Sequence, residues 1–159
     1  MRPARVEDAP EMAALLNEII AIGGTTAFED PVTPENMRDW YVEGPKLYCC
    51  HVAVDDAGAV AGFQMINRNP KLPEGIADIA TFARQSPLVR GIGTALFAET
   101  TAFARAAGCD AINATIRADN VPGLAYYSKM GFLDHDVDVG VPLKDGTPVD
   151  RISKRYQLV

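Results

Sequence analysis

The sequence is poor in the features that mark secreted, membrane-spanning and metal-binding proteins. Its three cysteines, Cys49, Cys50 and Cys109, show no CxxC spacing, and its two histidines have no partner at metal-ligand spacing. We interpret the cysteines as core thiols of a reducing cytoplasm and expect no metal. The first twenty residues mix charged and apolar side chains, unlike a signal peptide, and no apolar run reaches the roughly 18 residues that span a bilayer. We therefore expect a cytoplasmic protein that is not integrated into a membrane.

The sequence also has no excess of basic residues. Its formal net charge is −6, which gives the whole molecule no electrostatic attraction to nucleic acid or to an anionic membrane. Any anion that it binds must be held by local geometry. Apolar residues make up 48% and charged residues 23% of the 159 residues, which predicts one soluble domain over residues 1–159 with a packed core.

No internal repeat or low-complexity tract interrupts the chain. The periodicity of its apolar residues and its Gly, Pro and Asn/Asp turn signals predict a mixed α/β domain. Among the strands a hairpin comes first, and strands and helices alternate after it. The predicted helices cover residues 8–20, 35–42, 91–107 and 121–130, and the predicted strands cover 46–54, 60–66, 76–83, 111–116, 132–139 and 149–158.

A glycine-containing loop follows the third of these strands and opens the longest helix. Gly91 and Gly93 allow an anion to approach the backbone closely, and the free N–H groups of a helix N-terminus suit a diphosphate. Arg84 and Arg90 would add positive charge. Taken alone, Gly-x-Gly is a weak signal that is better explained as a tight turn with a glycine packed at a helix start. It is not a Walker loop, because no Gly-Lys-Ser/Thr follows, and the third glycine of a dinucleotide fingerprint is missing.

A second block strengthens this interpretation. Asn120 follows a strand, and Tyr127-x-Lys129-x-Gly131-Phe132 closes the next helix. With this block placed after the glycine loop, the sequence resembles the GNAT family of N-acetyltransferases over nearly the whole chain. The family usually has Gln or Arg three residues before the first glycine, where this sequence has Leu88. Arg90 can supply the missing charge.

The resemblance implies a central, mostly antiparallel twisted sheet of six to seven strands, flanked by about four helices. It implies acetyl-CoA as the co-substrate, main-chain contacts from a splayed strand at Phe82 and Ala83, and Tyr127 as the general acid that protonates the leaving thiolate. Tyr126, about 100° away on the helix, would point elsewhere. The implied cofactor-binding residues are Phe82, Ala83, Arg84, Arg90, Gly91, Ile92, Gly93, Thr94, Ala95, Asn120 and Lys129.

An amine acceptor also needs a base, because an alkyl amine with a pKa near 10 is almost wholly protonated at neutral pH. Asp78 stands where the phosphinothricin-acetyltransferase-like branch of the family carries a glutamate, and a bridging water would make up for its shorter side chain. A solvent-facing acid at a strand start is the alternative. By analogy with the same branch, Phe28, Glu29 and Trp40 would line the acceptor pocket; exposure or simple packing is the alternative for each.

The favoured hypothesis is an acetyl-CoA-dependent N-acetyltransferase that moves an acetyl group to a primary amine of a small molecule, an amino acid or an analogue, by direct attack. One alternative is a non-catalytic acyl-CoA sensor or interaction module on the same fold. Another, a nicotinamide dinucleotide enzyme, predicts stabilisation by NAD and none by coenzyme A. The sequence does not identify the amine. Exposed strand edges and the C-terminal hairpin would allow a homodimer.

Overall fold

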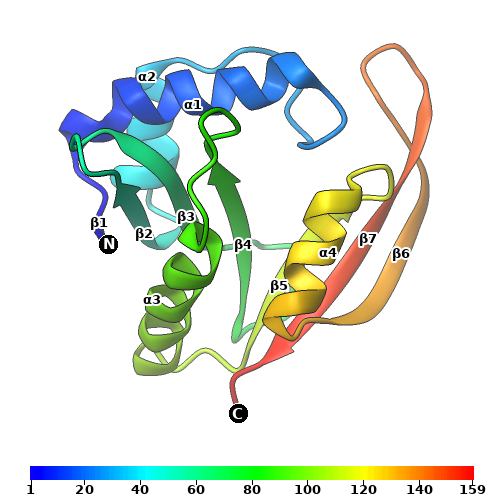
Figure 1. Ribbon diagram of the computed structural model, residues 1–159. Helices are drawn as coiled ribbons and strands as arrows, with labels where there is room; N and C mark the ends of the chain where they lie inside the picture. Colours follow the sequence, from blue (N-terminus) through cyan, green and yellow to red (C-terminus); the bar gives the residue numbers. More distant parts are fainter.

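A seven-stranded sheet forms the centre of the computed structural model, which describes residues 1–159 (Figure 1). The strands follow the order β1-β2-β3-β4-β5-β7-β6, and only β4 and β5 pair in parallel. This confirms the predicted mixed, mostly antiparallel sheet. The strands are β1 (Arg2–Pro3), β2 (Leu47–Val54), β3 (Val60–Arg68), β4 (Ile76–Ala83), β5 (Ala111–Arg117), β6 (Leu133–Pro142) and β7 (Pro148–Gln157).

Four helices flank the sheet, as predicted: α1 (Ala9–Ile22), α2 (Pro34–Met37), α3 (Ile92–Ala106) and α4 (Val121–Met130). A 3₁₀ turn, Val6–Asp8, leads into α1. The helix predicted over residues 35–42 consists of α2 and a wider π-helical turn, Arg38–Val42. The Thr33 side chain caps α2 by accepting a hydrogen bond from the N–H of Asn36 at 3.1 Å.

Each long helix exists because apolar residues recur on the face that it turns to the sheet. In α1, Met12 and Leu16 are fully buried one turn apart, and Gly23 ends the helix with a φ of 77°. In α3, Leu96 and Ala104 are fully buried two turns apart. The helices therefore cover the sheet by burying these stripes, which contributes about 25 cal/mol for each Å² of apolar surface removed from water.

The two faces of the sheet have separate cores. One core joins α1 and α2 to β2, β3 and β4, and includes Phe82 with Ala80 packed against it. The other joins α3 and α4 to β3, β4 and β5, and includes Ile79. Because side chains alternate along a strand, Asp78 has the same orientation as Ala80 and Phe82, and Thr81 has that of Ile79. Asp78 thus faces the α1 side and Thr81 the α4 side.

Candidate active site

β4 and β5 pair over only three residues and then part. The parallel register runs from Ile76 opposite Ala111 to Asp78 opposite Asn113. Beyond that point β5 continues beside β7 as far as Arg117, and β4 continues beside β3. Figure 1 shows the two strands diverging from this point. The second half of β4 therefore has no strand partner on the side of β5, as the family resemblance implied.

The register of β4 decides which main-chain groups face this opening. The N–H of Arg84 donates to the carbonyl of Ala61 at 2.8 Å. Since hydrogen-bonded pairs alternate along an antiparallel ladder, Phe82 also directs its main-chain groups toward β3. Thr81 and Ala83 direct theirs toward the opening. The expectation of free main-chain groups at both Phe82 and Ala83 therefore changes to Thr81 and the N–H of Ala83, because the Ala83 carbonyl accepts from Nε2 of Gln85 at 2.8 Å.

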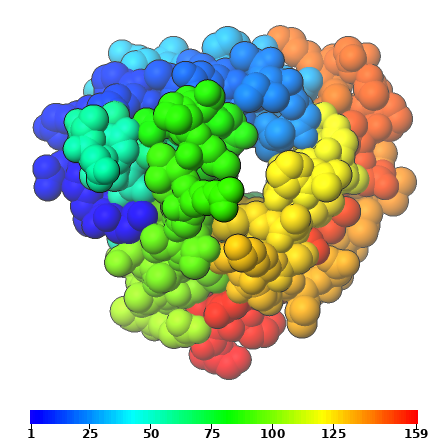
Figure 2. All heavy atoms as spheres, in the orientation of Figure 1, coloured from blue at the N-terminus to red at the C-terminus, as the bar shows by residue number.

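A cavity of about 480 Å³ fills the opening on the α4 side. Figure 2 shows the molecule hollowed here, between the green glycine loop, the yellow N-terminal part of α4 and the blue end of α1. The cavity therefore brings together the glycine loop and the start of α4, which are the two segments that the sequence patterns singled out. Its walls are the end of β4 (Thr81, Phe82, Ala83), the loop and helix start from Leu88 to Gly93, the start of α4 (Asn120, Pro122, Gly123, Tyr126, Tyr127), and also Ile19, Thr25 and Gln85.

The N-terminus of α3 presents uncapped N–H groups at this cavity. Gly91 is the N-cap residue with a φ of 80°, a conformation that favours glycine, and no side chain caps the helix. The N–H of Ala95 donates to the carbonyl of Gly91 at 3.0 Å, so the amide expected to bind the cofactor is used within the helix. The free donors are the N–H groups of Ile92, Gly93 and Thr94, which is the arrangement that binds anions.

The basic residues expected to assist the glycine loop lie in different places. Arg90 lines the cavity, is exposed and forms no ion pair, so its guanidinium is available to an anion. The Arg84 guanidinium instead pairs with Asp55 on the β2–β3 turn at 2.9 Å and donates to the carbonyl of Pro87 at 3.2 Å. Lys129 is exposed and does not line the cavity. Arg90 is therefore the one of the three that the structure brings to the cavity.

Tyr127 lines the cavity with a ring that is 7% exposed. Its Oη lies 2.9 Å from Oγ1 of Thr81 on the facing strand. Burial raises the pKa of Tyr127 above its ordinary value, partly offset by the hydrogen bond with Thr81. The phenol is therefore held in its protonated form, which is the form that a general acid requires.

Tyr126 does not point away from this region, contrary to the expectation from its position on the helix. Its ring centroid lies 4.9 Å from that of Tyr127, and its hydroxyl donates to the carbonyl of Gly93 at 2.7 Å. A Cβ atom on Gly93 would lie 2.5 Å from Cε1 of Tyr126. Gly93 thus allows α4 to pack directly against the start of α3, in addition to exposing its own amide.

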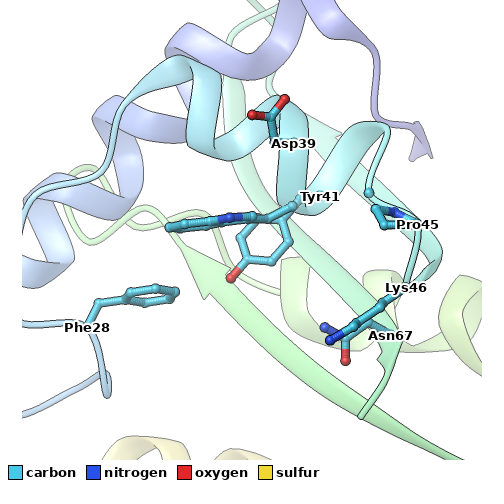
Figure 3. Close-up of a pocket in the computed structure, with 8 residues that line it drawn as sticks. Phe28, Asp39, Tyr41, Pro45, Lys46 and Asn67 are labelled. Carbon is cyan, nitrogen blue, oxygen red and sulfur yellow. The ribbon is translucent and has the colours of Figure 1, made fainter. Parts of the chain in front are cut away.

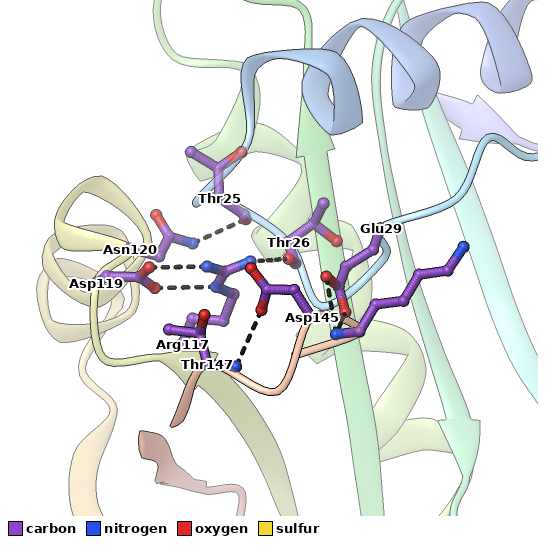
Figure 4. Close-up of polar contacts among 9 residues, drawn as sticks. Thr25, Thr26, Glu29, Arg117, Asp119, Asn120, Asp145 and Thr147 are labelled. Carbon is purple, nitrogen blue, oxygen red and sulfur yellow. Dashed lines mark hydrogen bonds and ion pairs between the residues drawn. The ribbon is translucent and has the colours of Figure 1, made fainter. Parts of the chain in front are cut away.

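Asn120 begins α4 and joins it to the segment after α1. Its Oδ1 accepts from the N–H of Gly123 at 3.0 Å, and its Nδ2 donates to the carbonyl of Thr25 at 2.9 Å. Beside it, Nη1 of Arg117 donates to the carbonyl of Thr26 at 3.2 Å (Figure 4). Asn120 therefore lines the cavity while both ends of its amide make structural hydrogen bonds.

Asp78 lies where β4 and β5 begin to part, and it is partly buried. Its carboxylate accepts hydrogen bonds from Nδ2 of Asn69 and Nδ2 of Asn113, both at 3.1 Å. Its partner across the β3 ladder is Asn67, which lines a separate cavity on the α1 side. Asp78 is thus next to that second cavity and on the opposite face of the sheet from Tyr127.

The second cavity has a volume of about 310 Å³ and an aromatic wall (Figure 3). The rings of Phe28 and Trp40 stack with centroids 5.9 Å apart and planes 10° apart. Tyr41 is 6% exposed, and Figure 3 shows its hydroxyl directed toward the space between Phe28 and Asn67. Phe28 and Trp40 are therefore brought together, as the analogy with the acceptor pocket implied.

Glu29 lies at the edge of this region, in an adjoining cavity that Phe28 and Trp40 also line. Its carboxylate accepts from the main-chain N–H of Lys144, with distances of 2.9 and 3.2 Å to its two oxygens (Figure 4). The Lys144 ammonium pairs with Asp30 at 2.6 Å. Glu29 thus fastens the β6–β7 hairpin to the segment between α1 and α2.

Two polar residues at the site were missed by the sequence analysis, namely Gln64 and Thr81. Nε2 of Gln64 donates to Oγ1 of Thr81 at 2.9 Å and to Oη of Tyr126 at 3.1 Å. The available signal was Gln64 in the middle of the apolar part of β3, and Thr81, which is with Asp78 one of two polar residues in β4. Their proximity depends on the β3–β4 register, which places Gln64 opposite Thr81.

Other site types find little support in the structure. No group of three or more His, Cys, Asp or Glu side chains is placed to hold a metal ion. None of the helices combines the length and the apolar character needed to cross a bilayer.

Comparison with known proteins agrees with this geometry. Residues 14–132 match the family described as Acetyltransferase (GNAT) family. The chain is 28% identical over 161 aligned residues to YwnH of Bacillus subtilis (strain 168), named provisionally as a phosphinothricin acetyltransferase, covering 99% of this chain and 94% of YwnH. It is 29% identical over 137 residues to the L-methionine sulfoximine/L-methionine sulfone acetyltransferase of Pseudomonas aeruginosa, covering 83% of this chain and 78% of that protein.

A solved structure has the same fold. It is a GNAT superfamily phosphinothricin acetyltransferase from Sinorhizobium meliloti in complex with AcCoA, which superposes with a TM-score of 0.84 at 21% identity over 98% of this chain and 86% of that one. The match of residues 14–132 to the family model defines the class of protein as an acetyltransferase. The chain belongs to the GNAT acetyltransferase family, and its acyl donor is acetyl-CoA.

Proposed function

We propose that this chain transfers an acetyl group from acetyl-CoA to the primary amine of a small molecule, an amino acid or an analogue, by direct attack of the amine on the thioester. The observation that carries the proposal is the parting of β4 and β5 beside a cavity that free amide donors and Tyr127 line, with a separate aromatic cavity on the α1 side. Relatives named for phosphinothricin and for methionine sulfoximine support an amino-acid-like acceptor.

The diphosphate of acetyl-CoA would bind at the N–H groups of Ile92, Gly93 and Thr94, with Arg90 adding positive charge. The pantetheine arm would lie along the free edge of β4, where Thr81 and Ala83 offer main-chain groups. One such N–H would stabilise the oxyanion of the tetrahedral intermediate, an interaction often worth about 3 kcal/mol in the transition state.

The two proton transfers would use opposite faces of the sheet. When the intermediate collapses, Tyr127 gives its phenolic proton to the departing thiolate. Asp78 would accept the proton of the attacking amine from the α1 side. Asp78 lies three residues before Thr81, roughly 10 Å along the strand, so at least one water must relay the proton.

The acceptor would enter through the aromatic cavity, with Phe28 and Trp40 against its apolar part. Glu29 would act indirectly, by fixing the segment that carries Phe28. The direct role expected for Lys129 has no support in its position, because it does not line the cavity.

The function is tested by thiol release from acetyl-CoA over a panel of amines that includes phosphinothricin, methionine sulfoximine and methionine sulfone. Calorimetry of acetyl-CoA binding accompanies it. Binding with saturable thiol release and a matching N-acetyl product supports the proposal. Binding without turnover on any amine would favour the non-catalytic sensor, and the absence of any coenzyme A binding would overturn both.

We also propose a homodimer. β6 is an edge strand of the sheet, and its apolar side chains Leu133 and Val139 are 75% and 81% exposed. Such an edge is open to pairing with a second chain. Light scattering that gives the monomer mass at micromolar concentration would contradict a dimer. The cytoplasmic location stays a prediction.

A further inference from the structure

Four polar side chains form a connected network between the sheet and α4, beside the proposed general acid. Gln64 is fully buried on β3, Thr81 lies on β4, and Tyr126 and Tyr127 lie on α4. The hydrogen bonds run from the carbonyl of Gly93 to Tyr126, Gln64, Thr81 and finally Tyr127, at distances of 2.7, 3.1, 2.9 and 2.9 Å. The network thus extends from the glycine loop to the acid.

The directions of the hydrogen bonds from Gly93 as far as Thr81 follow from the first one. A carbonyl only accepts, so the hydroxyl of Tyr126 donates its proton to Gly93, and its oxygen must accept from Gln64. This fixes the side-chain amide of Gln64 with its NH₂ group inward, because the opposite orientation would place two acceptors against each other. The second proton of Nε2 then goes to Oγ1 of Thr81.

The remaining hydrogen bond joins Thr81 to Tyr127. Oγ1 of Thr81 accepts from Gln64 and lies 2.9 Å from Oη of Tyr127, where either hydroxyl can be the donor. If Tyr127 donated, its proton would be held by Thr81 and would not face the cavity. The acid role therefore requires Thr81 to donate to Tyr127, which leaves the phenolic proton free to turn into the cavity.

We propose that Thr81 is the positioning residue of the general acid Tyr127, and that Gln64 and Tyr126 set the direction in which it donates. The proposal rests on the acid role of Tyr127 in the proposed function. The C–S bond of the tetrahedral intermediate breaks, the thiolate takes the phenolic proton, and the resulting phenolate keeps the hydrogen bond from Thr81. The proton that Asp78 has taken from the amine nitrogen then restores the phenol through water, so that both residues return to their starting forms and no proton is gained or lost overall.

A buried atom of Gln64 fits this role. Its Oε1 has no hydrogen-bond partner, although the side chain is fully buried. An apolar residue of similar size would avoid the cost of that unpaired acceptor. The amide is therefore placed where only its two donors are used, one for each hydroxyl that it orients.

The test compares Thr81→Val, which keeps the shape and removes the donor, with Thr81→Ser, which keeps the donor. One hydrogen bond to a charged group predicts that Thr81→Val lowers kcat about 10- to 100-fold and leaves the Kd for acetyl-CoA within about twofold. Thr81→Ser should recover most of kcat. If Thr81→Val does not fold, Thr81→Ala carries the same prediction, with the thermal midpoint as the folding control.

A double-mutant cycle with Tyr127→Phe separates positioning from simple packing. Once the phenol is gone, Thr81→Val should cost no further turnover. An equal loss of kcat in the Tyr127→Phe background, or a failure of Thr81→Ser to recover activity, would overturn the proposal. Full turnover of Tyr127→Phe would overturn it too, while leaving the acetyltransferase function intact. Absence of thiol release from the unchanged protein would instead count against the proposed function itself.

Discussion

Replacing Gly93 by alanine tests the packing on which the cofactor site depends. The added Cβ would lie 2.5 Å from Cε1, 3.1 Å from Cζ and 3.3 Å from Cδ1 of the Tyr126 ring. Ordinary contact needs about 3.5–4.0 Å, so the ring must move by about 1 Å. That shift would break or lengthen the 2.7 Å hydrogen bond from Tyr126 to the carbonyl of Gly93.

Two opposing effects decide the sign of the stability change. Alanine is favoured over glycine in a helix by about 0.8–1.0 kcal/mol. Overpacking costs about 1–3 kcal/mol, and the lost hydrogen bond costs about 1 kcal/mol more. The net expectation is a destabilisation of about 1–3 kcal/mol, or a fall in Tm of roughly 3–10 °C for a chain of this length.

Thermal unfolding of the variants measures this change, and a second background isolates its cause. In Tyr126→Ala, where the ring is absent, Gly93→Ala should become neutral or stabilising by up to about 1 kcal/mol. If Gly93→Ala lowers Tm equally in both backgrounds, or raises it in the otherwise unchanged chain, then contact with Tyr126 is not the reason for glycine at this position.

Three further predictions concern protons. Tyr127→Phe should lower kcat by about 10²-fold or more with little change in acetyl-CoA affinity by calorimetry, and unchanged turnover would remove its acid role. Asp78→Asn should flatten the rise of kcat/KM with pH, and an unaltered profile would count against Asp78 as the base. Hydrogen bonds from Arg2 at 2.8 Å lower the pKa of Asp8 from 3.8, so this pair stabilises the fold above about pH 4 and loses that contribution as the pH falls through the lower folded pKa. Chemical unfolding should therefore show a steeper acid loss in the unchanged protein than in Asp8→Asn, and equal slopes would refute this.

Local patterns were enough to predict the elements, because each reports on its own backbone. The apolar face through Ile92, Leu96 and Phe103 predicts α3, and Gly91 marks its start. The order of the predicted hairpin, strands and helices along the chain likewise predicts a mixed sheet. These patterns do not show which strands pair with each other. The separation of β4 from β5 was therefore implied only by the family resemblance and not by the residues.

The site residues that differ from expectation depend on distant partners. Arg84 is drawn to Asp55, on a hairpin turn 29 positions away in the chain, and this ion pair takes it from the cavity. Thr81, and not Phe82, has main-chain groups that face the opening, because the pairing with β3 decides which residues of β4 direct their N–H and C=O groups toward β3. Tyr126 and Tyr127 both contact the site because the face that a helix buries is at least 100° wide. None of these partners is visible in a local window of sequence.

The segment between α1 and α2 is fastened to the rest of the domain through its own carbonyls, at Thr25 and Thr26. Every amino acid carries the same main-chain carbonyl, so these hydrogen bonds do not depend on which side chains the segment carries. Substitutions along this stretch can therefore reshape the amine pocket without releasing it from α4 and β5. The preference for one amine acceptor over another could therefore change through substitutions in this segment, while the proposed acetyl-CoA site at α3 and α4 stays unchanged.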